Sequence, residues 1–355
     1  MSELAIERSL SVQSRVGKGW IVSPAFDLFL LMLGPVVAAP IMFGYFMGNR
    51  LLAIGGSLTL AAAHYLSSLA FYFWQENKEY HRERWIAFYL GPLILAAIYS
   101  ILIVLRVPYV LQFTLFFWNA VHVARQNCGI LSVYRHRGGV TDVSQKTAAN
   151  RAIISTAIFL SLWNIETHME VTALFDMVAR NIAPFIRIGA GVVAVISIAD
   201  LVRVLWKRSR IAKTIQVPEA MFLLASLVYF YPFLIIRRSE MAFLATLLPH
   251  YVQYMALVWL VHRRKFGAAD QGGVSLPLKK LSGNLIYLLP TLAIVGFSFY
   301  ILNNLLAEAG KQAVFQTLFI LIAFEHFYLD GLIWSFKRKH VRDTIGPALT
   351  GAPAR

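Results

Sequence analysis

Apolar residues occur along the chain in long runs separated by short polar segments. A run of about 20 residues is long enough to cross roughly 30 Å of hydrocarbon as an α-helix. The run at 152–166 is the shortest and ends in polar residues, so it could instead be a half-span or a re-entrant segment. The pattern predicts an all-α, polytopic transmembrane helix bundle of about ten helices, at 26–48, 51–74, 85–105, 107–134, 152–166, 182–206, 216–236, 240–262, 284–306 and 313–336.

The basic residues indicate how this bundle is oriented. Most Lys and Arg side chains fall in alternate loops, on one side of the predicted arrangement, and the bias persists to the end of the chain. Because cytoplasmic loops carry an excess of Lys and Arg, both termini are predicted to be cytoplasmic. We expect a single integral membrane domain over 1–355, with a cytoplasmic segment at 1–25 and a basic cytoplasmic tail at 337–355.

The composition supports a location in a membrane. The chain is 58% hydrophobic and 14% charged, with a mean hydropathy of +0.62, and its charged fraction is about half that of a soluble domain. The net charge of +15 collects in loops, so the expected partner is a lipid bilayer and not nucleic acid. The single cysteine, Cys128, excludes an intrachain disulfide. We expect an integral protein of a bacterial inner (cytoplasmic) membrane.

Four histidines, His64, His122, His250 and His326, fall inside predicted helices. Under the predicted topology their helices all run inward, and each histidine lies roughly 15–18 Å from the cytoplasmic end. An ionisable side chain in hydrocarbon is costly and therefore indicates either a functional site or a hydrogen bond between helices. The common depth favours a shared site. By contrast, His81, His136 and His340 fall in basic loops or the basic tail and are expected to be solvated.

Each of the four histidines is followed one helical turn later by a polar residue. On the same helix faces these residues form a second layer: Ser68, Gln126, Tyr254 and Asp330. Arg125 lies too far from its helix end to reach the interface easily, so we expect it to pair with Glu325 or Asp330. Trp334, near the end of a span, is assigned to the interfacial aromatic belt.

The chemistry of these residues points to a transition metal. Imidazole is neutral near pH 7 and binds iron, copper or zinc, whereas magnesium and calcium prefer oxygen ligands. We predict a metal site formed by the four histidines, completed by Glu325 or a water. Asp330, Gln126 and Tyr254 could accept or donate hydrogen bonds at the second ring nitrogen of the ligands. Non-haem iron is the expected cofactor, and haem or copper is the alternative.

A membrane bundle in which each of several helices contributes one buried histidine resembles the Brp/Blh type of carotenoid-cleaving oxygenase. The resemblance rests on His64, His122, His250 and His326. It implies a non-haem iron held by intramembrane histidines. The membrane diiron desaturases and hydroxylases differ from this chain, because their clustered His-x-x-x-His and His-x-x-His-His motifs are absent here.

These observations lead to a metalloenzyme as the first functional hypothesis. It would oxidise, desaturate or cleave an apolar, lipid-like small molecule that enters from the bilayer, with a possible electron donor as a further partner. Arg125, Gln126, Tyr254 and Asp330 are the candidate catalytic residues, which would orient ligands or handle protons. The alternatives are a haem-binding electron-transfer protein and a proton-coupled transporter whose histidines line a path.

Overall fold

A computed structural model describes residues 19–34, 36–37, 41, 44, 50–105, 107–140, 142–165, 179–210, 216–266 and 285–350. Within these residues every regular element is a helix and no strand occurs, which confirms the all-α prediction. The predicted helix at 26–48 is described at 26–34, 36–37, 41 and 44, and the segment 1–25 at 19–25.

The helices fall into a long and a short class. The long helices are α4 (Arg50–Ser67), α6 (Gly91–Val104), α7 (Pro108–Arg137), α8 (Val143–Ser161), α10 (Ala179–Arg210), α11 (Val217–Val228), α13 (Ser239–Phe266), α15 (Leu285–Glu308) and α16 (Gln312–Ile333). The short ones are α2 (Pro24–Phe26), η1 (Asp27–Leu31), η2 (Ser68–Phe73), α5 (Gln75–Glu83), η3 (Ile86–Leu90), α12 (Pro232–Ile235), α17 (Lys339–Thr344) and α18 (Gly346–Thr350).

The described part of the chain has five helical stretches that are long and apolar enough to cross a membrane. They are Ile86–Val104, Asn181–Arg210, Val217–Ile235, Ser239–Lys265 and Gln312–Ile333. A bundle of about ten spans with cytoplasmic termini stays a prediction. These five stretches are sufficient for an integral membrane protein.

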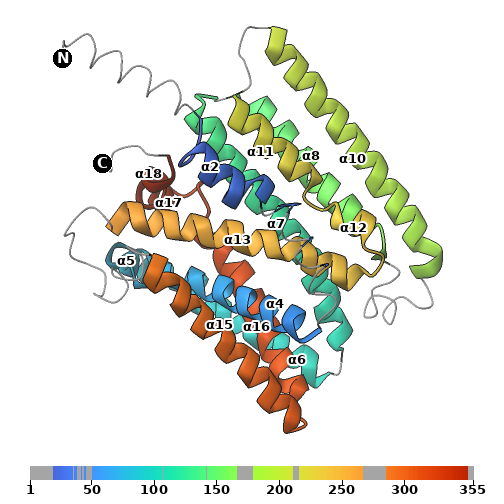
Figure 1. Ribbon diagram of the computed structural model, residues 1–355, viewed down its shortest axis with the longest axis vertical. Helices are drawn as coiled ribbons and strands as arrows, with labels where there is room; N and C mark the ends of the chain where they lie inside the picture. The colour runs from blue at the N-terminus through green and yellow to red at the C-terminus, as the bar shows by residue number, and fades with distance from the viewer. Residues whose placement is uncertain are drawn as a thin grey trace.

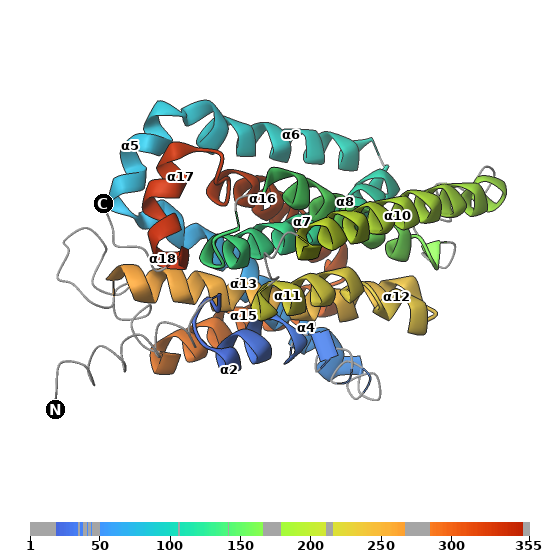
Figure 2. The same ribbon diagram turned by 90° about the horizontal axis from the view of Figure 1, so that it is seen from above.

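Burial separates the outer helices from the central ones. Only 11% of the span Ile86–Val104 and 17% of Asn181–Arg210 are buried, against 83% of Ser239–Lys265. Accordingly, α6 and α10 lie at the outside of the bundle and α13 crosses its middle, next to α4, α7 and α16 (Figures 1 and 2). The exposed apolar surface of the outer helices is the kind of surface that hydrocarbon covers.

The weakest predicted span, at 152–166, belongs to a longer helix. Helix α8 begins at Val143 because Asp142 caps it, its carboxylate accepting hydrogen bonds from the backbone N–H of Ser144 at 2.8 Å and of Gln145 at 3.5 Å. Hydropathy alone misses this polar first part. Helix α8 ends at Ser161 and packs between α7 and α10.

Helices α4 and α15 approach each other closely at Gly296. A Cβ atom at this position would lie 2.4 Å from the carbonyl oxygen of Thr59. Only glycine permits this approach, as is common where small residues let membrane helices pack. The contact fixes the position of α4, which carries His64.

Buried charges tie together the helices on the far side of α7. The Glu219 carboxylate on α11 accepts a hydrogen bond from Gln145 of α8 at 3.0 Å and lies 3.3 Å from both Arg135 of α7 and Arg208 of α10. Four helices therefore meet at one carboxylate. A buried charge is tolerated when it is paired in this way.

Short helices gather at one end of the bundle. Helices α5, α17 and α18 lie there beside the C-terminal end of α13 (Figures 1 and 2). Arg264 of α13 donates hydrogen bonds to the carbonyl oxygen of Ala348 at 2.8 Å and to that of Ile21 at 2.6 Å. The basic tail thus folds against the bundle as far as residue 350. We call this side the basic end, because α5, α17 and the last turn of α13 carry many Lys and Arg residues.

Candidate metal centre

The four histidines singled out in the sequence come together in the centre of the bundle. His64 is near the end of α4, His122 in the middle of α7, His250 in α13 and His326 in α16. One nitrogen from each ring can be chosen so that all four atoms lie within 4.8 Å of one another. The expectation of a shared site is confirmed at the level of geometry.

The four imidazole rings form a closed loop in the order His64, His250, His122 and His326. The centroid of His64 lies 4.6 Å from that of His250 and 4.3 Å from that of His326. On the other side, His122 lies 5.1 Å and 5.4 Å from the same two rings. Each helix therefore contributes one imidazole to a common centre.

The ring nitrogens at this centre are short of partners. His64, His250 and His326 are 0%, 1% and 2% exposed. Six buried ring nitrogens have no hydrogen bond to any described residue, namely both of His64, both of His250, and the Nε2 atoms of His122 and His326. An unsatisfied buried polar group costs about 1–3 kcal/mol, so such a concentration needs an explanation.

A metal ion would explain part of this set, because it could take one nitrogen from each ring, which leaves the second nitrogen of His64 and of His250 without a partner among the described residues. Four nitrogens at about 2.1 Å from one ion are separated by about 3–4 Å, according to the coordination geometry. The observed limit of 4.8 Å is slightly wider, so small side-chain movements would complete the coordination. The donor set fits a transition metal such as iron, copper or zinc.

The carboxylate of Asp330 lies next to two of the rings. Its Oδ2 atom is 3.5 Å from Nε2 of His326 and 3.8 Å from Nε2 of His122. Its other oxygen accepts hydrogen bonds from the hydroxyls of Tyr254 at 2.6 Å and of Ser68 at 3.0 Å. Asp330 thus places a carboxylate beside otherwise neutral ligands, in a position to offset the charge of a cation.

The second layer also orients the ligand His326. Its Nδ1 atom is hydrogen-bonded to the hydroxyl of Ser68 at 2.9 Å, which leaves Nε2 directed to the centre. The Tyr254 hydroxyl lies 2.7 Å from that of Ser68 and accepts a hydrogen bond from the indole N–H of Trp334 at 3.0 Å. Three of the four residues predicted for this layer therefore meet: Ser68, Tyr254 and Asp330.

Gln126 lies outside this network. It follows His122 on α7, but neither its side-chain oxygen nor its nitrogen has a hydrogen-bond partner in the described part of the chain, although both atoms are buried. The expected hydrogen bond to a ligand is not formed.

Arg125 and Glu325 lie away from the cluster. Arg125 is exposed on α7 and forms no ion pair with any described residue, so the expected acidic partner is not found. Glu325 precedes His326 and so projects about 100° away from it around α16. It is not part of the four-histidine group. The spacing of one residue alone already places Glu325 on a different face of α16 from His326.

Aromatic rings enclose the site, and the sequence did not single them out. The ring of Tyr251 lies 4.9 Å from that of His64, and Tyr65 lies 5.1 Å from His326. Trp334, which was assigned to an interfacial belt, instead contacts Tyr254. Aromatic residues are frequent in every span, so their position beside the histidines becomes visible only when the helices are packed.

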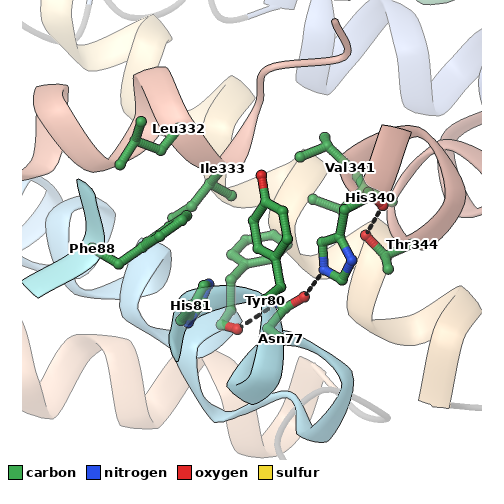
Figure 3. Close-up of a pocket in the computed structure, with 11 residues that line it drawn as sticks. Asn77, Tyr80, His81, Phe88, Leu332, Ile333, His340, Val341 and Thr344 are labelled. Carbon is green, nitrogen blue, oxygen red and sulfur yellow. Dashed lines mark hydrogen bonds between the residues drawn. The ribbon is translucent and has the colours of Figure 1, made fainter. Parts of the chain in front are cut away.

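A separate pocket lies at the basic end, and it corrects the expectation for two other histidines (Figure 3). His81 is only 3% exposed, and His340 stacks on Tyr80 at 4.0 Å while its Nε2 lies 2.7 Å from the side-chain oxygen of Asn77. Burial lowers the pKa of His81 to about 4, with a smaller effect from His340. Both histidines were expected to be solvated. The tail folds back over α5, where it helps to bury His81 and brings its own His340 onto Tyr80.

Comparisons of this chain with protein-family models, with curated proteins and with solved structures gave no match. The function is therefore inferred from the four histidines and their neighbours.

Proposed function

We propose that this protein is an integral membrane metalloenzyme that holds one iron ion at His64, His122, His250 and His326. The observation that carries this proposal is that four histidines, each with at least one buried ring nitrogen without a hydrogen-bond partner among the described residues, bring one nitrogen apiece within 4.8 Å of one another. Iron suits nitrogen ligands together with a nearby carboxylate, and when bound it would supply oxygen-dependent redox chemistry. The similarity in design to the Brp/Blh oxygenases supports the same choice.

The packing of the rings favours an ion over a haem. Two axial histidines must be separated by a planar macrocycle that extends well beyond them on all sides. Here four imidazole rings contact one another, with centroids 4.3–5.4 Å apart, and Tyr251 and Tyr254 pack against His64. This arrangement suits a single ion.

Asp330, Tyr254 and Ser68 would support the chemistry without binding substrate. The Asp330 carboxylate would balance the positive charge of the ion, and the hydrogen bonds that it accepts from Tyr254 and Ser68 hold it in place. Ser68 fixes the ring of His326. Such neighbours usually set the affinity of a site for its metal.

We propose an apolar or amphiphilic lipid-like substrate that enters from the bilayer. His122 is the most accessible of the four ligands, its side chain being 10% exposed, whereas that of His326 is 1% exposed. Phe327 packs on its ring at 4.6 Å and offers an apolar contact. Arg125, exposed less than one turn away, offers a charged contact for the polar end of an amphiphile.

The test is an oxygen-labelling experiment. Iron-loaded protein in nanodiscs would be incubated with a bacterial lipid extract and ascorbate as reductant under ¹⁸O₂, and the extract compared by mass spectrometry with that from the His122→Ala variant. The proposal predicts lipid products that need oxygen and the wild-type protein, together with no Soret band in the spectrum. A Soret band, or identical extracts with fully iron-loaded wild-type protein, would contradict it.

A further inference from the structure

A row of aromatic rings leads from the candidate metal centre to the basic end of the bundle. It begins at Tyr254, whose ring centroid lies 4.4 Å from that of His64 and 5.5 Å from that of His326. The next ring is Trp334 at 5.8 Å, which also donates its indole N–H to the Tyr254 hydroxyl at 3.0 Å. The row therefore starts in direct contact with two ligands.

The row continues without a gap. Phe71 lies 5.3 Å from Trp334, and Trp74 lies 4.8 Å from Phe71. His262 contacts both Phe71 and Trp74, at 5.1 and 5.3 Å, and accepts a hydrogen bond from the indole N–H of Trp74 at 3.2 Å. Along α13, the eight residues from Tyr254 to His262 correspond to about 12 Å of helix rise.

The far end of the row lies just below the surface. Trp74 is 1% exposed and His262 is 4% exposed. The Lys265 ammonium covers the Trp74 ring at 4.4 Å and forms an ion pair with Glu76 on α5. The last ring thus lies next to a cationic side chain that is itself partly exposed, at 18% for Lys265.

The surface around this point carries many cations. Six exposed Lys and Arg residues come from α5, the α5–η3 turn, the end of α13, and α17: Lys78, Arg82, Arg84, Arg263, Lys339 and Arg342. The exposed acids on the same elements are fewer: Glu76, Glu79, Glu83 and Asp343. A surface of this kind attracts an acidic partner by electrostatic steering.

We propose that Tyr254, Trp334, Phe71 and Trp74 form the route by which an acidic one-electron carrier protein, docked at the basic end, reduces the metal centre. This inference rests on the proposed function. Each step oxidises the carrier by one electron and reduces the ferric ion to the ferrous ion, while the four rings end unchanged. The electron tunnels between the carrier and the iron without residing on a ring, and the closely packed rings provide a better medium for tunnelling than a gap of the same length.

The location of the row argues against a purely structural role. Ring contacts of this kind also stabilise packing by about 0.5–1.5 kcal/mol each. Packing alone, however, does not require that the row link the histidine cluster to a surface of the described chain that is rich in exposed cations.

The test measures the rate at which the iron is reduced and does not depend on substrate turnover. Ferric protein in nanodiscs would be mixed without oxygen with reduced plant-type ferredoxin, an acidic one-electron carrier. Rapid freeze-quench EPR would then follow the loss of the ferric signal. The variants are Trp334→Leu and Trp74→Leu, with Trp206→Leu as the control, because Trp206 is exposed on α10 away from the row.

The route predicts a rate at least tenfold lower in Trp334→Leu and Trp74→Leu, with an unchanged rate in Trp206→Leu. Iron content and melting temperature, measured on the same samples, separate a broken route from a damaged fold. Trp334→Phe keeps a ring and should retain most of the rate. Full iron content with unchanged rates in both leucine variants would overturn the route alone, whereas a wild type that binds no iron would overturn the proposed function and the route with it.

Discussion

At the scale of single residues, the centre consists of neutral donors with one carboxylate beside them. The four imidazoles come from four helices, and Asp330 stands 3.5 and 3.8 Å from the Nε2 atoms of His326 and His122. In the proposed metal centre the histidines would provide coordination, whereas the carboxylate would provide charge. These two contributions can be separated by mutation.

Replacing Asp330 by Asn tests the contribution of charge. The variant keeps the size of the side chain and an oxygen that can accept from Tyr254, but it removes the negative charge. Substitutions next to ligands typically weaken metal affinity by 10–100-fold, and we expect a loss in that range. Competition with a coloured ferrous chelator would measure it. Asp343→Asn, on the exposed side of α17, should leave the affinity unchanged. Equal affinities in both variants would exclude a role for the Asp330 charge.

His81 predicts a loss of stability in acid. Its pKa is lowered by burial to about 4 in the folded protein, against about 6.5 in the unfolded chain. Between these values the unfolded chain binds a proton that the folded protein does not. Unfolding therefore becomes more favourable as the pH falls from 6.5 to 4.5, by about 2–3 kcal/mol.

The charged and titratable neighbours of His81 are few. His340 lies close to it, and the rings of Tyr72 and Tyr80 contact it at 4.7 and 6.0 Å. Thermal melts from pH 7.5 to 4.5 should show a smaller decline for His81→Gln than for the wild type. His136→Gln, exposed on α7, should follow the wild type. A parallel decline in all three proteins would place the acid sensitivity elsewhere.

At the scale of helices, the position of each histidine depends on how its helix packs. Helix α13 is largely buried and carries both His250 and Tyr254, so it acts as the central support. Helix α4 depends on its close contact with α15, where Gly296 meets the backbone of Thr59. A substitution at that contact should therefore displace His64, although His64 itself is not mutated.

Gly296→Ala tests this dependence. The added Cβ atom would lie 2.4 Å from the Thr59 carbonyl oxygen, so α4 and α15 must move apart. We expect a lower melting temperature and a metal affinity reduced several-fold, measured by differential scanning fluorimetry and by chelator competition. Gly189→Ala, on α10, is the matched control because its Cβ would meet open space. If Gly296→Ala had the melting temperature and metal affinity of the wild type, the contact would not be needed to hold His64.

At the scale of the whole molecule, the sequence predicted the features that depend on composition and on how deep a residue lies along its helix. Long apolar runs predict helices, and the common depth of His64, His122, His250 and His326 predicts their meeting. Rotation about a helix axis is harder to infer, because 100° separates neighbouring residues and several helices compete for each face. Glu325 was expected to complete the centre and lies outside the four-histidine group, and Arg125 forms no ion pair with a described residue. Trp334 was assigned to the interfacial belt, and the sequence did not predict its contact with Tyr254.

Long-range contacts set the remaining features. Nothing in the local sequence around His81 or Asn77 shows that residues near 340 return to cover them. The start of α8 depends on one capping side chain, Asp142, in a segment too polar for hydropathy to mark. Both features follow from hydrogen bonds and packing, and these become visible only when distant segments are placed together.

Metal analysis of the purified protein tests the central claim most directly. Inductively coupled plasma mass spectrometry would be applied to the wild type, to the double variant His122→Ala with His326→Ala, and to Arg125→Gln as a control on α7 outside the cluster. We predict about one transition-metal ion per chain in the wild type and in Arg125→Gln, and at least a tenfold loss in the double variant. A wild type without stoichiometric metal, or a folded double variant that keeps its metal, would contradict a four-histidine metal centre.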